Sequence, residues 1–162
     1  MTNYICINGR KAELTEEQMK ALGIELHKKY IFSYVEGEDY YFITSYGKVL
    51  KTNSSVNRHD RHDVANYCTD KAIMEQRALS EFLNRLLWRY SMEHDGDKID
   101  WSVASKNKYY IYYSYQDHEF CINYANTYRD IGMIYFDNYE DAENAIKEII
   151  KPFMKAHPDF KF

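Results

Sequence analysis

Proline and glycine are scarce in this chain, whose 162 residues include 2 prolines and 6 glycines. Collagen-like and low-complexity chains need far more of both residues, so we expect a globular protein. The glycines are isolated and form neither a G-x-G-x-x-G pattern nor a P-loop. These two glycine signatures of phosphate binding are therefore absent from the sequence.

Cysteine is also sparse, and no two cysteines have the spacing C-x-x-C. Cys6, Cys68 and Cys121 are far apart and odd in number. This pattern argues against a disulfide scaffold and a zinc ribbon, and it indicates reduced structural thiols. The nucleophile motif G-x-S-x-G is missing as well. The sequence thus offers no catalytic motif, and we predict no cofactor and no metal.

Long apolar runs are missing too. No stretch reaches the ~20 apolar residues of a membrane span, and the N-terminus lacks a basic region followed by a long apolar one. We therefore expect a cytoplasmic protein that does not associate with membranes. The net charge is −4 with both signs interspersed, which disfavours a dedicated nucleic-acid binder because such domains are basic.

Tyrosine is abundant, with 17 residues. Coding bias is one explanation, because Tyr, Lys, Ile and Asn all have AT-rich codons. The other explanation is a binding surface lined with tyrosines, since Tyr offers a large amphipathic contact area at a low cost in side-chain entropy.

Residues 70–92 predict a long central helix with Thr69 as its N-cap, because the run has no Gly or Pro and is rich in helix formers. Its apolar arc spans about 180°, wider than the ~100° of a surface helix, so we expect more than one element to cover it. The arc comprises Ala78, Leu79, Phe82, Leu83, Leu86, Leu87 and Tyr90. Trp88 lies on the polar face, where it either packs under another segment or anchors a partner.

Shorter elements flank this helix. Residues 4–7 predict a strand, and Thr15 with Gln18 predicts a capping box for a short helix that ends at Gly23. Runs rich in β-formers, separated by turn residues, predict two antiparallel meanders: 30–35, 40–44 and 48–52, then 109–115, 119–124 and 131–136.

The remaining segments connect or close these units. Residues 53–63 predict a polar loop, and 64–68 a short strand that leads into the central helix. A last helix is expected to begin near 137–138, and Pro152 should end or kink it. The tail that follows, to residue 162, is expected to be loosely held.

The predicted fold is α+β, with two antiparallel meander-plus-helix units around a long central helix and a short N-terminal strand–helix element. We place a domain boundary between an appendage, 1–29, and an α+β core, 30–162. The units also resemble each other, which suggests an internal repeat; chance similarity in a Tyr-rich sequence is the alternative. The matching segments are 40–46 with 109–115 and 67–75 with 135–143.

Three stretches carry a resemblance to known proteins: 40–49, 65–79 and 132–146. They are similar to small accessory proteins carried by phages and integrated elements of low-GC Gram-positive bacteria, over roughly residues 30–151. The resemblance brings no catalytic residues with it. It implies a setting in which small proteins often block host defence, and some anti-CRISPR proteins come from that background.

The densest polar cluster is Asn57–Asp63. His59 and His62 have a spacing that could share a metal, but the intervening arginine would repel a cation, so a solvated loop or a partner contact is favoured. The predicted partner-binding residues are Arg58, His59, Arg61, His62, Trp88, Tyr110 and Tyr112.

These observations lead to one expected function and two alternatives. The first is a non-enzymatic phage or mobile-element protein that binds and inhibits a host defence nuclease, such as a CRISPR effector. The second is a nucleic-acid-binding accessory protein that stacks bases on sheet aromatics, with Arg77, Arg85 or Arg89 on phosphates. The third is an enzyme whose site the sequence does not reveal.

Overall fold

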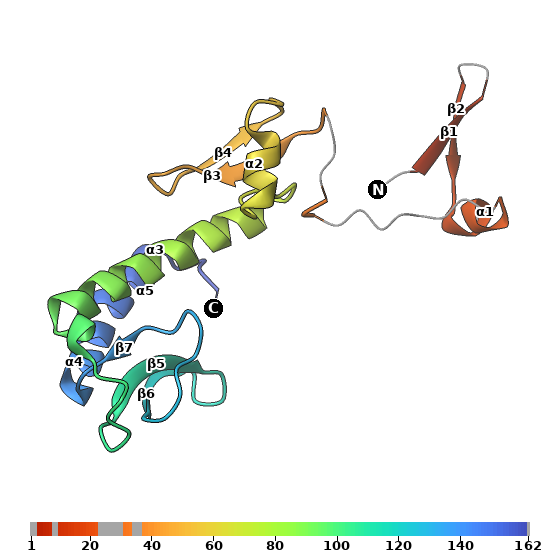
Figure 1. The fold of residues 1–162 in the computed structure, drawn as a ribbon. Coiled ribbons are helices and arrows are strands. Elements are labelled where there is room, and N and C mark those ends of the chain that lie inside the picture. Colours follow the sequence, from red (N-terminus) through yellow and green to blue (C-terminus); the bar gives the residue numbers. More distant parts are fainter. Residues whose placement is uncertain (1–2, 8–9, 23–30, 34–36, 162) are drawn as a thin grey trace.

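The computed structural model describes residues 3–7, 10–22, 31–33 and 37–161. The fold is α+β, as predicted, and helix α3 (Lys71–Glu93) connects two groups of strands (Figure 1). The hairpin of β3 (Tyr40–Ile43) and β4 (Val49–Thr52) packs on the N-terminal half of α3. The sheet of β5, β6 and β7 lies beside its C-terminal half.

Helix α3 begins one residue later than the sequence predicts. Asp70 is the N-cap, and its carboxylate accepts a hydrogen bond of 3.1 Å from the N–H of Ile73. The expected cap, Thr69, instead donates both its N–H and its hydroxyl to the carbonyl of Ile31. Thr69 thus fastens an upstream segment, while the neighbouring carboxylate caps the helix.

The segment after the first hairpin differs from the prediction. Residues 53–63 are not all loop, because Arg58–Asp63 form the short helix α2. The strand expected at 64–68 is reduced to one bridge, between Tyr41 and Cys68. Asn66 explains the reduction: its side-chain amide accepts from the N–H of Ile43 and donates to the carbonyl of Ile43, both at 2.7 Å. A side chain therefore occupies the place of a second bridge.

Strand β5 (Lys108–Ser114) is the central strand of the other sheet, between β6 (Glu119–Ala125) and β7 (Tyr135–Phe136). The predicted meander is wrong here, because the third strand pairs with the first strand and not with the second. The connection from 126 to 134 is long enough to cross the sheet. It is held there by the N–H of Asp130, which donates to the hydroxyl of Tyr135 at 3.0 Å.

The last helix continues past Pro152 where the sequence predicts a kink or an end. Asn138 caps α4 (Tyr139–Ala145), and a π-helical segment, η2 (Ile146–Ile150), leads directly into α5 (Lys151–Ala156). Proline removes one N–H donor and crowds the carbonyl four residues earlier. The wider π turn before it relieves that crowding, so the helix is preserved.

The C-terminal tail is docked on α3, which contradicts the expectation of a loose tail. Phe160 is buried against Leu83, Ile150 and Phe153. The side chain of Gln76 brackets it, donating to the carbonyl of Asp159 at 2.9 Å and accepting from the N–H of Lys161 at 2.8 Å. The wide apolar arc of α3 is thus covered by several elements, as the sequence predicts.

At the other end of the chain, β1 (Asn3–Ile7) and β2 (Arg10–Leu14) pair as a hairpin, and α1 (Glu16–Ala21) follows. The capping box is confirmed by reciprocal bonds between Thr15 and Gln18. Figure 1 draws this unit apart from the rest. The predicted turn at 8–9 and the cap at Gly23 lie outside the described residues, and the boundary after residue 29 stays a prediction. Of the strand predicted at 30–35, residues 31–33 are described and form a turn in place of a strand.

The two halves of the core share an order of elements. In each half a first strand pairs with its hairpin partner on one side and with a later segment on the other, and a capped helix follows. One shift in numbering relates Tyr41 to Tyr109, Cys68 to Phe136 and Asp70 to Asn138. The predicted alignment of 40–46 with 109–115 is therefore displaced by one residue, because Tyr109 corresponds to Tyr41 and not to Tyr40. The spatial superposition of the two halves stays a prediction.

None of the helices in the described parts of the chain combines the length and the apolarity that a membrane crossing requires.

One backbone position leads to a stability prediction. Ala65 has a φ of 55°, a left-handed conformation in which its Cβ is crowded. Replacing it with glycine should raise the free energy of unfolding by roughly 0.5–1 kcal/mol. Glycine relieves the backbone strain, and this gain exceeds the conformational entropy that glycine loses on folding. Equilibrium urea unfolding measures the change. Ala72→Gly, in helical backbone, is the control and should lower stability; a loss with Ala65→Gly would contradict the prediction.

Candidate functional site

A row of four aromatic side chains runs across the outer face of the second sheet. The ring centroids of Tyr112 and Tyr110 are 6.4 Å apart, those of Tyr110 and Tyr135 are 5.7 Å apart, and those of Tyr135 and Trp101 are 4.8 Å apart. The last two contacts are edge-to-face, an arrangement that aromatic quadrupoles favour. The row is therefore a rigid feature built from three separate segments, in which Tyr112 is exposed and Tyr135 is buried.

Strand alternation explains why the row forms. In β5, Tyr109 and Ile111 face the helices, where both pack in the core. Tyr110 and Tyr112 consequently point to the opposite face, because successive side chains of a strand alternate. Register then places Tyr135 of β7 directly beside Tyr110. The tyrosines of β5 thus belong to both of its faces: Tyr109 packs in the core, and Tyr110 and Tyr112 form the row on the opposite face.

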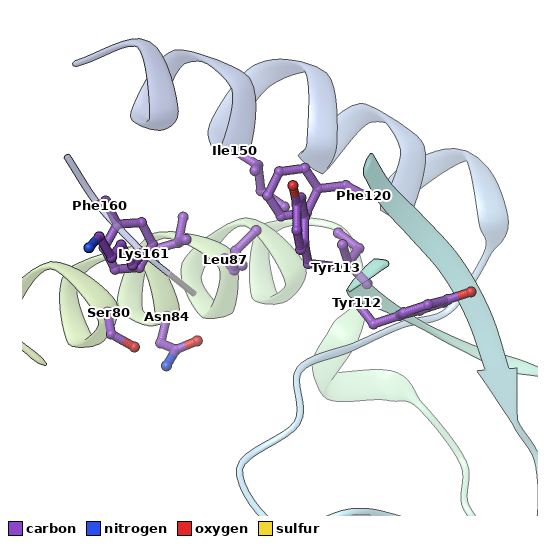
Figure 2. A pocket seen from close by; sticks show the side chains of 11 residues that line it. Ser80, Asn84, Leu87, Tyr112, Tyr113, Phe120, Ile150, Phe160 and Lys161 are labelled. Atoms are coloured by element: carbon purple, nitrogen blue, oxygen red, sulfur yellow. The ribbon is translucent and has the colours of Figure 1, made fainter. Parts of the chain in front are cut away.

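Each end of the row borders a pocket beside α3. Tyr112 lines a pocket of ≈270 Å³ together with Ser80 and Asn84 of α3, and Figure 2 shows its hydroxyl directed away from those helical residues. At the other end, Trp101 and Tyr135 line a pocket of ≈300 Å³ with Trp88. The row and the pocket of Trp88 form one strip, whereas the pocket beside Tyr112 lies on the helix-facing side of the sheet, with Ile111 and Tyr113.

Trp88 lies on this strip, and 58% of its surface is exposed. The expectation that another segment covers it is therefore wrong for the described residues. Its pocket is lined further by Ile99 and by Met92 and Met133. The flexible side chains of the two methionines adapt to a bound side chain. Tyr128, on the loop that crosses the sheet, is half exposed and bonds to Tyr110.

Two cations lie near Trp101. The Nζ of Lys108 is 5.5 Å from a Trp101 ring centroid, and the guanidinium carbon of Arg129 is 5.6 Å from it, both within cation–π range. Lys108 is fully buried, and its Nζ donates to the carbonyls of Val103 and Asn126. Lys108 therefore ties the loops that carry Trp101 and Tyr128, whereas Arg129 is exposed at the rim of the pocket.

Two tyrosines of the row, Tyr110 and Tyr112, have pKa values raised above the ordinary value and are neutral at physiological pH. Burial raises the pKa of Tyr110 above its ordinary value, and its hydrogen bond with Tyr128 raises it further. A hydrogen bond with Cys121, the residue opposite in β6, raises the pKa of Tyr112. We name the residues Trp88, Trp101, Tyr110, Tyr112, Tyr128 and Arg129 the aromatic surface. It combines an uncharged apolar strip with one exposed cation.

The structure brings three predicted partner-binding residues to this surface, Trp88, Tyr110 and Tyr112, and places the other four on α2. Arg58 is fully buried and donates from Nη2 to the carbonyls of Glu38 and Asn53. Arg61 lies on the ring of Phe42, 3.6 Å from its centroid, and donates to the hydroxyl of Tyr40 at 2.8 Å. These arginines hold α2 against β3.

The two predicted histidines differ in exposure. His59 is exposed on α2, while His62 is half-buried and meets the ring of Tyr67 edge-on, with centroids 5.7 Å apart. Among the residues that the structure describes, no group of three or more His, Cys, Asp or Glu side chains has a geometry that could hold a metal ion.

Sequence reasoning missed Trp101, Tyr128 and Arg129, because all three lie in connections that read as polar. The alternation of Ile99, Trp101 and Val103 was the one local signal. It belongs to no strand, since the segment contains only the short 3-10 helix η1 (Gly96–Lys98) and turns.

Comparison with known proteins adds no relative. No protein-family model matches this chain, no curated protein is similar to it, and no solved structure matches its fold.

Proposed function

We propose that this chain is a non-enzymatic binding protein of a phage or mobile element, which inhibits a host defence nuclease by attaching to it through the aromatic surface. The observation that carries the proposal is the strip itself. Trp88, Tyr112 and Tyr128 are exposed on it, and each contacts an aromatic residue of the row or shares a pocket with one. The resemblance to accessory proteins of mobile elements supports the choice of a defence nuclease as target.

The chemistry of the strip suits protein recognition. Trp, Tyr and Arg are the residue types enriched at the centres of protein interfaces, where a few anchors carry most of the binding energy. A stable interface buries about 800 Å² on each partner, and the strip would supply the centre of such an interface. The contribution of Arg129 would be a rim contact to a carboxylate of the target.

Rigidity of the strip favours tight binding. Tyr110 is fixed by three aromatic neighbours, and beneath the row the hydroxyl of Ser91 in α3 donates to the carbonyl of Tyr135 at 2.6 Å. Side chains that are already ordered lose less entropy on binding than mobile ones. A small protein can therefore block a larger nuclease by covering the channel or surface that the nuclease needs for its substrate.

The row of sheet tyrosines also favours a second candidate function, which is binding of single-stranded nucleic acid. Aromatic side chains on a sheet stack with unpaired bases, and Arg129 could neutralise a phosphate. The net charge of −4 disfavours this function. Strong weakening of binding with rising salt would identify it, because release of counterions from the phosphates drives such complexes.

Affinity capture decides between the two functions. The tagged chain is incubated with lysate of a low-GC Gram-positive host, with and without nuclease treatment, and bound proteins are identified by mass spectrometry. One dominant partner that survives nuclease treatment supports the inhibitor function. Recovery that disappears on nuclease treatment supports the nucleic-acid function and overturns the first.

Point variants locate the contact. Trp88→Ala and Tyr112→Ala, tested separately, should each weaken binding to the captured partner by at least about tenfold, since truncation of a hot-spot residue costs roughly 1.4 kcal/mol or more. Biolayer interferometry measures the affinities. Tyr139→Ala is the matched control, because this tyrosine is equally exposed but lies at the start of α4. Unchanged affinity of both surface variants would remove the aromatic surface from the interface.

A further inference from the structure

A third recess lies on the other half of α3, away from the aromatic surface. It has a volume of ≈670 Å³ and is bounded by α3, the β3–β4 hairpin and the C-terminal tail. Tyr46, Leu50 and Phe82 line it and are 80%, 48% and 43% exposed. Leu79 and Ala78 form part of its floor. We refer to this recess as the hairpin groove.

The groove is the part of the wide apolar arc of α3 that the residues described by the structure leave open. Leu83 and Tyr90 on the same arc are buried by the last helix and the second sheet, whereas Phe82 remains half exposed. Glu75 and Arg85 mark the extent of the lining along α3. Ten residues of α-helix span about 15 Å, so the groove accommodates about three helical turns.

The two ends of the groove carry opposite charge. Glu75 and Asp159 lie at the end near Gln76, whose amide bonds to the backbone of Asp159. Lys48 and Arg85 lie at the other end. There the hairpin turn meets α3, and the Arg85 guanidinium is so close to Gly47 that a Cβ built on this glycine would lie 3.5 Å from it.

Among the described residues, part of this charge has no partner. Glu75 pairs with Lys71 and Arg85 pairs with Glu81. Lys48 and Asp159, by contrast, form no ion pair with any residue that the structure describes. One free charge of each sign therefore remains, a cation at one end of the groove and an anion at the other.

We propose that the hairpin groove binds an amphipathic α-helix of a partner protein, oriented antiparallel to α3. Such helices usually carry acidic residues in the first turn and basic residues in the last turn, in keeping with the helix dipole. The first turn then lies at Lys48 and the last turn at Asp159, while apolar residues at i, i+4 and i+7 enter between Leu50 and Phe82. This site is separate from the aromatic surface and does not depend on the proposed function.

A pair of synthetic peptides tests the orientation and the chemistry together. Each is fluorescein-labelled and has about 14 residues, roughly 21 Å of helix, with leucines at i, i+4, i+7 and i+11. The first carries Glu in the first turn and Lys in the last turn; the second has these charges exchanged. Fluorescence anisotropy with the full chain should show the first peptide binding at least about fivefold more tightly than the second.

Variants of the groove supply the decisive controls. Phe82→Asp, and Leu50→Asp as a second variant on the hairpin, should each weaken binding of the first peptide by at least about tenfold, whereas Tyr139→Ala should leave it unchanged. The double variant Lys48→Glu, Asp159→Lys should reverse the preference between the peptides. Circular dichroism of each variant verifies the fold, and Leu50→Asp keeps the test valid where Phe82→Asp disturbs the contact with Phe153.

Three results would overturn the proposal. The first is absence of binding of either peptide up to about 1 mM. The second is equal affinity for both peptides, or an affinity that neither groove variant changes. The third is a dimer of the chain in sedimentation velocity that Phe82→Asp dissociates, since the occupant would then be a second copy.

Discussion

Replacing Arg58 with alanine is expected to lower the free energy of unfolding by about 3 kcal/mol. Arg58 is the largest fully buried side chain of the described residues. Its removal leaves the carbonyls of Glu38 and Asn53 without this donor, opens a cavity beside the ring of Tyr40, and removes a cation–π contact of 5.1 Å. Equilibrium urea unfolding, followed by circular dichroism, measures the loss.

Two further variants make this result specific. Arg58→Lys should recover only part of the stability, because one ammonium group lacks the planar fork that reaches both carbonyls. His59→Ala, at the exposed neighbouring position, should change stability by less than about 0.5 kcal/mol. An Arg58→Ala protein as stable as the wild type would show that the arginine does not fasten α2.

The second large effect is expected for Phe160→Ala, with a loss of about 3 kcal/mol. The ring of Phe160 lies edge-on to that of Phe153, with centroids 5.5 Å apart, in the cluster that contains Leu83 and Ile150. Truncation leaves a cavity in that cluster and releases the tail from Gln76. Thermal unfolding measures the stability, and limited proteolysis should show faster cleavage after Lys155 or Lys161.

Lys161→Ala is the control for this second prediction, because the side chain is exposed and only the backbone N–H meets Gln76. It should leave the melting temperature almost unchanged. If Phe160→Ala unfolds at the wild-type temperature with an equally protected tail, the tail contributes no packing and the description of a docked tail is wrong.

Local patterns accounted for most of the helices and strands. The capping box at Thr15, the cap at Asn138 and the long apolar arc of α3 follow from interactions within one or two turns, which sequence spacing encodes directly. The tail was mispredicted for the opposite reason. Phe160 is held by residues more than 80 positions earlier, such as Gln76, and no local pattern reports such a contact.

Strand order shows the same limit. The hairpin of β5 and β6 was predicted from a short turn, but β7 returns to the far side of β5 after a connection that crosses the sheet. The pairing of Tyr109 with Phe136 and of Tyr110 with Tyr135 reveals that path. A side chain that replaces a strand, as Asn66 does beside Ile43, is likewise absent from any pattern of alternation.

The candidate site was predicted in part. Trp88 was selected as an aromatic residue on the polar face of its helix, and Tyr110 and Tyr112 as part of a Tyr-rich strand. The structure gathers the three in one strip. The arginines of Arg58–Asp63 were selected for their charge. Arg58 lies inside the fold and Arg61 lies on a ring of β3, because their long side chains reach carbonyls and aromatic faces that the sequence does not place near them.

Inhibition of the captured nuclease by the purified chain is the most direct test of the central claim. Cleavage of the nuclease's own substrate is measured while wild-type chain, Trp88→Ala or Tyr139→Ala is titrated in. The account predicts that the wild type and Tyr139→Ala stop cleavage near equimolar amounts, and that Trp88→Ala requires at least about tenfold more. Cleavage that continues at full rate with excess wild-type chain, or equal inhibition by all three proteins, would contradict it.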